Sequence, residues 1–437
     1  MYMYRKVSGY LENWKSSEYR KPLIIQGARQ VGKTYAIMEF GKRNYDNVAY
    51  FNFQTNPTLA ATFSENISPS YLLPILSHLS GQTIIKGNTL IIFDEIQLCE
   101  RALTSLKYFC EEAPDYHVIA AGSLLGVAVN REKFAFPVGK VERYTMYPMD
   151  IEEFLLALGE KKLIDETRSC YENNSPMPLA LHESGLRLYR QYLAIGGMPE
   201  VVARFIDTGD YNQVRHLLET IQMGYLDDMS KYQNNSSEIK KTRLTYNTVS
   251  VQLSKKNTRF QYKIIKNGAR AAEYENAIEW LISANLLSRI YRAEQIIKPL
   301  ENYKDIDDFK IYLSDMGLLA AQKDIRAEDI FFMADELKGF KGGVTENYVN
   351  TQLIRSGFKP YFWRNENGTK EVDFIVQINN KLIPIEVKSG IRIGADSLNE
   401  YVKTFKPDYS IRVSEKNFGL ENNIKSVPLY AIFCIRE

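Results

Sequence analysis

The first third of the chain alternates short apolar runs with stretches in which apolar residues recur at helical spacing. The runs at 23–26, 48–53, 90–94 and 117–121 have the length and apolar character of buried strands. Strands that alternate with helices predict βαβ units, in which a parallel sheet is covered on both faces. We therefore expect an α/β fold at this end of the chain.

The middle of the chain is mostly helical in its pattern. Residues 161–180 are polar and contain Asn-Asn-Ser-Pro, which predicts a loop or a weakly ordered connection. Helical periodicity follows at 184–195 and 211–229, and a polar break follows at 233–237. This pattern predicts a helical lid or connector.

Residues 238–330 predict helices that end in a β-hairpin. One predicted helix carries apolar side chains on a single face: Tyr274, Ile278, Leu281 and Ile282. That helix leads into strands at 285–291 and 309–314, with a polar loop between them. Helices followed by a hairpin are the layout of a winged helix-turn-helix.

From residue 343 the pattern changes again. It predicts a helix at 345–356 and strands at 361–364, 372–378 and 381–388, with Asn379 and Asn380 as the turn between the last two strands. The C-terminal part is therefore a second α/β region.

Composition limits the classes of protein to consider. The chain has 437 residues, enough for about three domains. Hydrophobic residues make up 45% and charged residues 25%, which excludes overall disorder. The net charge of +2 shows no overall excess of the kind found in dedicated nucleic-acid or membrane binders.

Cysteine usage and hydropathy indicate a cytoplasmic protein with reduced thiols. The four cysteines show neither disulfide-rich nor zinc-finger spacing: Cys99, Cys110, Cys170 and Cys434. The N-terminal sequence lacks the apolar core of a secretory signal, and no run reaches the roughly 18 apolar residues of a membrane-spanning helix. We expect no membrane association.

Residues 27–34 fit the pattern GxxxxGK[ST], directly after a predicted strand and before a predicted helix. In this pattern backbone amides surround the phosphates at a helix N-terminus. Lys33 would bridge the β- and γ-phosphates, and Thr34 would bind Mg²⁺. The predicted ATP-binding residues are Gly27, Ala28, Arg29, Gln30, Val31, Gly32, Lys33, Thr34 and Tyr35.

The apolar run at 90–93 ends in Asp94 and Glu95. A buried strand would place Asp94 near the Mg²⁺ ion and Glu95 where it could activate a water molecule, which favours hydrolysis over passive binding of the nucleotide. Ser123, after the next strand, would either contact the γ-phosphate or cap a helix. Arg101, Arg131 and Arg143 are candidate arginine fingers, and each could equally be a surface charge.

The segments RKPLIIQGARQVGKT, LIIFDEIQ and AAGSLLG resemble a group of bacterial and archaeal AAA-type ATPases. In that group a P-loop domain precedes a winged helix and a C-terminal restriction-endonuclease-like domain. Residues 195–200 and 309–315 also match its pattern. The resemblance implies four parts, namely a P-loop ATPase domain at 1–165, a helical connector at 166–235, a winged helix at 236–335 and a nuclease-like domain at 336–437.

Three acidic residues and a lysine stand out near the C-terminus. Glu386 and Lys388 project from one face of a strand, and Asp373 lies on the preceding hairpin strand, so the two carboxylates can meet. Paired carboxylates favour a divalent cation, and Glu346 could complete an oxygen-rich site for Mg²⁺. Lys388 could orient or deprotonate a metal-bound water.

These four positions resemble the core of PD-(D/E)xK nucleases, with valine at 372 where the motif has proline. The resemblance implies that Asp373 and Glu386 bind metal and that all four residues act in catalysis. The alternative is alternating surface charge with a cross-strand pair, and a retained fold can also serve recognition or assembly.

A basic stretch at 255–270 contains Phe260 and Tyr262 and is typical of a phosphate-facing surface. Nine basic residues could contribute: Lys240, Lys241, Arg243, Lys255, Lys256, Arg259, Lys263, Lys266 and Arg270. A winged helix in such an ATPase could instead act as a lid or dock a protein. The sequence is therefore compatible with three functions of the ATPase: a transaction on DNA or RNA, nucleotide-gated signalling or assembly, and remodelling of a protein partner. It is also compatible with oligomerisation.

Overall fold

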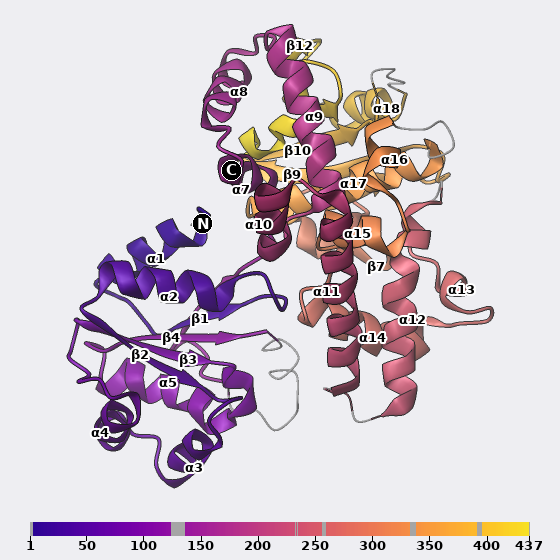
Figure 1. Ribbon diagram of the computed structural model, residues 1–437. Coiled ribbons are helices and arrows are strands. Elements are labelled where there is room, and N and C mark those ends of the chain that lie inside the picture. The colour runs from indigo at the N-terminus through magenta and orange to yellow at the C-terminus, as the bar shows by residue number, and fades with distance from the viewer. Residues whose placement is uncertain are drawn as a thin grey trace. The chain divides into compact units, whose positions relative to one another are not determined.

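The computed structural model describes residues 3–123, 136–231, 233, 235–255, 259–332, 338–390 and 396–436 (Figure 1). The chain divides into two compact units. Residues 2–147, with 283–285, form the N-terminal unit, and 148–282 and 286–437 form the C-terminal unit. Each unit is described by itself.

The N-terminal unit is a five-stranded sheet with helices on both faces, as the alternating pattern predicts (Figure 1). Its elements are α1 (Val7–Ser16), β1 (Leu23–Gln26), α2 (Lys33–Asn44), β2 (Asn47–Asn52), α3 (Pro57–Glu65), α4 (Pro69–Ser80), β3 (Thr89–Asp94), α5 (Glu100–Glu112), β4 (His117–Gly122) and β5 (Glu142–Thr145). The strand order is β2-β3-β4-β1-β5, and every pair is parallel.

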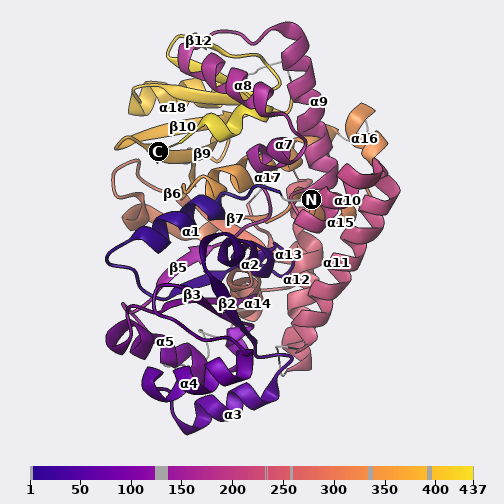
Figure 2. The ribbon, with the colours of Figure 1, turned by 60° about the vertical axis from the view of Figure 1, so that its left-hand side comes forward.

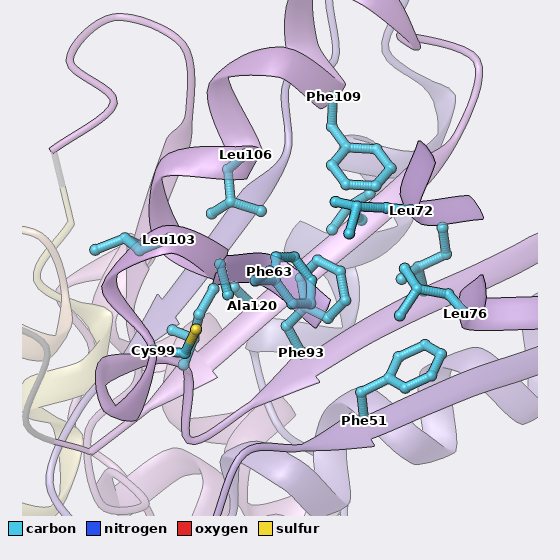
Figure 3. Packing of buried hydrophobic residues seen from close by; sticks show 14 of the residues in the cluster. Phe51, Phe63, Leu72, Leu76, Phe93, Cys99, Leu103, Leu106, Phe109 and Ala120 are labelled. Atoms are coloured by element: carbon cyan, nitrogen blue, oxygen red, sulfur yellow. The ribbon is translucent and has the colours of Figure 1, made fainter. Parts of the chain in front are cut away.

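An aromatic cluster fixes the position of β3 in this sheet (Figure 3). Phe93 makes edge contacts with Phe63 on α3 and Phe109 on α5, at ring-centroid distances of 5.6 and 6.2 Å. All three rings are fully buried. Burying a phenylalanine contributes about 1.5–3 kcal/mol, so this cluster anchors the strand that ends in Asp94.

The C-terminal unit joins a set of helices to an eight-stranded mixed sheet (Figure 2). Its helices are α7 (Ile151–Ala157), α8 (Lys161–Asn173), α9 (Leu179–Ile195), α10 (Pro199–Thr208), α11 (Tyr211–Lys231), α12 (Ser236–Leu253), α13 (Tyr262–Ile265), α14 (Ala271–Ser283), α15 (Met316–Gln322), α16 (Ala327–Phe332), α17 (Lys338–Arg355) and α18 (Asp396–Phe405). Its strands are β6 (Leu287–Ala293), β7 (Lys304–Leu313), β8 (Tyr361–Arg364), β9 (Glu371–Ile378), β10 (Lys381–Val387), β11 (Ser410–Ser414), β12 (Gly419–Glu421) and β13 (Ile424–Pro428).

The strand order in this sheet is β12-β13-β11-β10-β9-β8-β6-β7. The turn between β9 and β10 is the predicted one, and Asn379 and Asn380 both have positive φ, as a two-residue hairpin of type I′ requires. The predicted hairpin near 285–314 is β6 and β7, and β6 pairs in parallel with β8 at Arg292 and Phe362. The hairpin therefore shares one sheet with the strands after residue 360.

Three sequence-based predictions of secondary structure are wrong. The strand predicted at 309–314 begins earlier, because β7 starts at Lys304 within the predicted polar loop. Residues 161–180, predicted as a loop, contain helix α8 and the start of α9. The buried residues of α8 lie at helical spacing, Leu163, Ile164, Thr167 and Cys170, but its many exposed polar residues hide the pattern in the sequence. The predicted start of α17 at residue 345 is also too late, because the helix runs through Gly342 and Gly343 from Lys338.

Candidate nucleotide site and C-terminal carboxylate cluster

The loop at 27–34 follows β1 and leads into α2, as the motif predicts. Gly27 has φ of +150°, and a Cβ there would lie 2.1 Å from the carbonyl oxygen of Met146, just after β5. Gly32 (φ +90°) precedes the first residue of α2. The buried Arg5, which the sequence motifs do not indicate, braces the loop by donating to the carbonyl of Val31 at 2.8 Å.

Lys33 begins α2 and is 7% exposed. Its ammonium donates to the carbonyl oxygens of Gly27 and Ala28 at 3.0 and 2.8 Å. Burial lowers the pKa of Lys33 to about 8, against the opposing charges of Glu95 and Asp94. The ammonium therefore lies inside the loop that would surround a phosphate group.

Thr34 and Asp94 meet although 60 positions separate them in the sequence. Thr34 Oγ1 donates to Asp94 Oδ2 at 2.9 Å, and the Tyr50 hydroxyl donates to the same oxygen at 2.7 Å. Asp94 is 4% exposed at the end of β3. A hydroxyl and a carboxylate at this distance supply the oxygen ligands and the negative charge that suit Mg²⁺ next to a nucleotide.

Glu95 follows Asp94 in a left-handed conformation with φ of +52°. Its amide donates to Asp94 Oδ1 at 3.0 Å, and its carboxylate accepts a hydrogen bond from the Gln97 side chain. A non-glycine residue in this region of φ, held by neighbouring contacts, is a feature that recurs at functional sites. Tyr50 was not predicted, because it lies outside the sequence motifs, and Gln97 lies within the segment LIIFDEIQ but was given no role there.

Ser123 is buried at the end of β4, which lies between β1 and β3 in the sheet. The register pairs Gln26 with Gly122, so Ser123 and Gly27 follow paired residues at the same edge. The sheet order therefore places Ser123 between the loop at 27–34 and the end of β3. The alternative role of Ser123, as the cap of a helix, involves residues 124–135, which lie outside the described residues.

The three candidate finger arginines have different surroundings. Arg101 Nε donates to the carbonyl of Phe63 at 2.7 Å. Arg143 lies over the ring of Phe136, with its guanidinium carbon 3.7 Å from the ring centroid. Arg131 lies outside the described residues. Two of the three candidates thus make contacts within their own unit.

In the C-terminal unit, Asp373 and Glu386 lie on adjacent antiparallel strands. The last backbone pair of these strands is Phe374 with Ile385, so Asp373 and Glu386 lie one step beyond it. Asp373 Oδ2 accepts a hydrogen bond of 2.7 Å from the Val387 amide. Lys388, just after β10, forms an ion pair with Glu386.

Burial and like charge act on the two carboxyl groups. Burial, followed by the charges of Glu386 and Glu346, raises the pKa of Asp373 well above its ordinary value. Burial also raises the pKa of Glu386, against the charge of Lys388. Burial would lower the pKa of Lys388, but the charge of Glu386 outweighs it and raises that pKa. A divalent cation would relieve the repulsion between the carboxylates.

Glu386 has one carboxylate oxygen that lacks a donor. Its Oε2 is buried and accepts no hydrogen bond from the described residues. Arg412 on β11 is the register partner of Glu386 and contributes favourable charge. A buried oxygen without a donor, beside a second carboxylate, fits a bound cation.

Glu346 on α17 reaches the same cluster. Glu346, Glu371 and Asp373 each offer a carboxylate oxygen, and these oxygens lie within 4.8 Å of one another. The Tyr312 hydroxyl donates to Glu346 Oε1 at 2.6 Å. Of the four predicted residues, Glu346 and Glu386 each interact electrostatically with Asp373, and Lys388 contacts the cluster through Glu386.

Lys310 on β7 is a member of this cluster that was not predicted. It is 0% exposed, and its ammonium lies 2.7 Å from Glu346 Oε1 and 2.5 Å from Glu371 Oε1. Arg364 donates to the other oxygen of Glu371, at 2.9 and 2.6 Å. The only signal in the sequence is a lysine within a run of otherwise apolar residues, 309–313.

The aromatic residues of the basic stretch point inward. Phe260 is buried and stacks on Phe309 with the ring centroids 5.4 Å apart, and the Tyr262 hydroxyl donates to Glu275. Arg259 lies 3.5 Å from Asp308. Lys256 lies outside the described residues. These contacts remove Phe260 as a stacking surface for a base.

Comparison with known families assigns the nucleotide site to a class. Residues 19–155 match the family described as AAA domain. Residues 186–329 and 341–432 match two families described as domains of unknown function, DUF8612 and DUF4143. No curated protein matches the chain. The chain therefore carries a nucleotide-binding domain of the AAA ATPase type.

Several solved structures are distantly similar to the chain. The Aeropyrum pernix ORC2 protein (ADPNP-ADP complexes) has 11% identity and a TM-score of 0.35 over 76% of this chain and 96% of that one. The Thermotoga maritima RuvB Holliday junction branch migration motor has 13% identity and a TM-score of 0.29 over 66% and 90%. C. elegans PCH-2 has 10% identity and a TM-score of 0.29 over 51% and 70%. Similarity at this level identifies neither a substrate nor a partner.

Among the described residues, no helix has both the length and the apolar character required to span a membrane.

Proposed function

We propose that this chain, which carries an AAA-type ATPase domain, hydrolyses ATP with Mg²⁺ and uses the nucleotide state to switch its C-terminal unit. The observation that carries the proposal is the 2.9 Å hydrogen bond between Thr34 and Asp94. It joins a phosphate-binding loop to a carboxylate that can hold the ion, beside a glutamate suited to water activation.

The residues of the loop would act together on the triphosphate. Backbone amides of residues 27–34 and the N-terminus of α2 bind the phosphate oxygens, and Lys33 bridges the β- and γ-phosphates. Thr34 and Asp94 would hold Mg²⁺, which would supply positive charge to the phosphates. Glu95 accepts a proton from the attacking water, and Ser123 donates toward the γ-phosphate or that water.

Replacement of Lys33 tests this assignment. Lys33→Ala should abolish ATP turnover, because it removes the ammonium that lies inside the loop and would bridge the phosphates. Lys42→Ala is the matched control, since Lys42 lies on the same helix but its side chain is 64% exposed and pairs with Glu39. Turnover that survives in Lys33→Ala, measured as released phosphate, would contradict the assignment.

For the C-terminal unit we propose metal-dependent cleavage of DNA or RNA. The supporting observation is the buried Glu386 Oε2 without a donor, beside Asp373. These two residues would hold Mg²⁺, which supplies Lewis acidity and a more acidic bound water. Lys388, whose pKa is raised by its ion pair with Glu386, would orient that water as an ammonium, and Glu346 would complete the acidic cluster.

A second candidate function for this unit is nucleotide-gated signalling or assembly without cleavage. The observation that favours it is Lys310, whose ammonium pairs with both Glu346 and Glu371 without a metal. Remodelling of a protein partner belongs to the same class.

The two candidates differ in one assay. Wild type and Asp373→Ala are incubated with plasmid, single-stranded DNA and RNA, with Mg²⁺ or Mn²⁺, with and without ATP. The control is Asp408→Ala, which replaces a more exposed aspartate paired with Lys381. Cleavage that disappears in Asp373→Ala but survives in Asp408→Ala would support the nuclease. Absence of cleavage by wild type in every condition would contradict it and favour the second candidate.

We propose further that residues 236–335 act as a winged helix and that the chain divides near 165, 235 and 335. Support comes from three helices followed by an antiparallel hairpin, α12 to β7. Salt-dependent DNA binding that is lost when Lys255 and Lys263 are neutralised would support a nucleic-acid role. Binding that is unaffected would favour protein docking.

A further inference from the structure

The carboxylate cluster of the C-terminal unit contains a positive charge from a strand outside the predicted nuclease-like segment. Lys310 lies on β7, in the hairpin predicted as a wing, and its side chain is entirely buried. Its ammonium contacts Glu346 on α17 and Glu371 on β9, at 2.7 and 2.5 Å. Three separate elements therefore meet at this ammonium.

The two carboxylates around Lys310 are already supplied with donors. Glu346 Oε1 accepts from both Lys310 and the Tyr312 hydroxyl. Glu371 accepts from Lys310 on one oxygen and from Arg364 on the other. This half of the cluster is neutralised by side chains of the chain itself.

In the other half of the cluster Lys388 pairs with Glu386 Oε1, but the second oxygen of that carboxylate has no donor in the part of the chain that the structure describes. Asp373 accepts one hydrogen bond, from the Val387 amide, while the buried Glu386 Oε2 accepts none from the described residues. The oxygen that lacks a donor thus belongs to Glu386 on β10, while Asp373 on β9 is acted on by the charges of both Glu386 and Lys310.

We propose that the Lys310 ammonium occupies one of two cation positions in this cluster, so that the site binds a single divalent cation, at Asp373 and Glu386. Two-metal sites place their ions about 3.5–4 Å apart across shared carboxylates. An ammonium held between Glu346 and Glu371, whose oxygens lie within 4.8 Å of Asp373, excludes a second ion by charge and by volume. This inference deepens the proposed metal-dependent function and rests on it.

The test is the number of Mn²⁺ ions bound by the full chain without nucleotide, measured by electron paramagnetic resonance and calorimetry. The Asp94→Asn background removes the carboxylate ligand of the nucleotide site. One Mn²⁺ per chain is expected, and Asp373→Asn should remove it. Lys310→Met should bind two, and Lys310→Arg, which keeps the charge, should bind one.

A second variant covers the case in which Lys310→Met fails to fold because two buried carboxylates lose their counter-charge. Lys310→Met with Glu346→Gln removes one negative and one positive charge together, and it should bind one Mn²⁺. Either of two results would overturn this inference but leave the proposed metal-dependent function standing. The first is two Asp373-dependent ions in the Asp94→Asn chain, and the second is one ion in a folded Lys310→Met variant. Absence of any Asp373-dependent ion would overturn the proposed metal-dependent function, and the inference with it.

Discussion

At the scale of single residues, Lys33 shows how a short motif specifies chemistry. The lysine is buried within the loop, where carbonyl oxygens are its acceptors. The pattern GxxxxGK[ST] predicted this residue because the motif and its contacts are local. Arg5 and Lys310 could not be predicted in this way, because their partners lie 26 or more positions away.

The lowered pKa of Lys33 predicts a pH dependence of ATP binding. The phosphates favour the ammonium, so affinity should be constant below about pH 7.5 and fall above pH 8, by up to about tenfold per pH unit, as the free protein loses the proton. The measurement is the dissociation constant for ATP between pH 7 and 9.5.

Lys33→Arg is the control for this pH profile, since arginine stays charged throughout the range. It should bind ATP more weakly but with a flatter profile. An affinity of wild type that does not change up to pH 9.5 would contradict the role of the Lys33 proton.

At the scale of elements, two adjacent glycines in α17 have opposite environments. A Cβ on Gly343 would lie 1.9 Å from the carbonyl oxygen of Leu253, the last residue of α12, whereas a Cβ on Gly342 would meet nothing within 4 Å. The sequence predicted that this helix begins at residue 345, after the glycine pair. The packing of α12 against α17 instead requires a glycine at 343.

The glycine pair predicts opposite effects of the same substitution. Gly343→Ala should lower the free energy of unfolding by about 1–3 kcal/mol, because the helices must move apart. Gly342→Ala should be neutral or raise it by up to about 1 kcal/mol, since alanine favours the helix. Denaturant unfolding of both variants measures the difference, and equal effects would contradict the packing argument.

At the scale of the whole chain, the sequence predicted the parallel sheet of the N-terminal unit because its strands are buried apolar runs. It missed β5, whose residues are polar and only partly buried. It also could not predict that β6 joins β8, because that pairing connects residues 70 positions apart through a single register pair, Arg292 and Phe362. Asp373 and Glu386 could be paired from the sequence because a two-residue turn fixes their register.

The most direct test of the account is ATP hydrolysis by Glu95→Gln in the full chain, with ATP binding measured on the same sample. Glutamine keeps the size of the side chain but cannot accept the proton of the attacking water. We expect Mg²⁺-ATP binding to be retained while turnover falls by about 10²–10⁴-fold. Turnover at the wild-type rate in Glu95→Gln would contradict the role of Glu95 in hydrolysis.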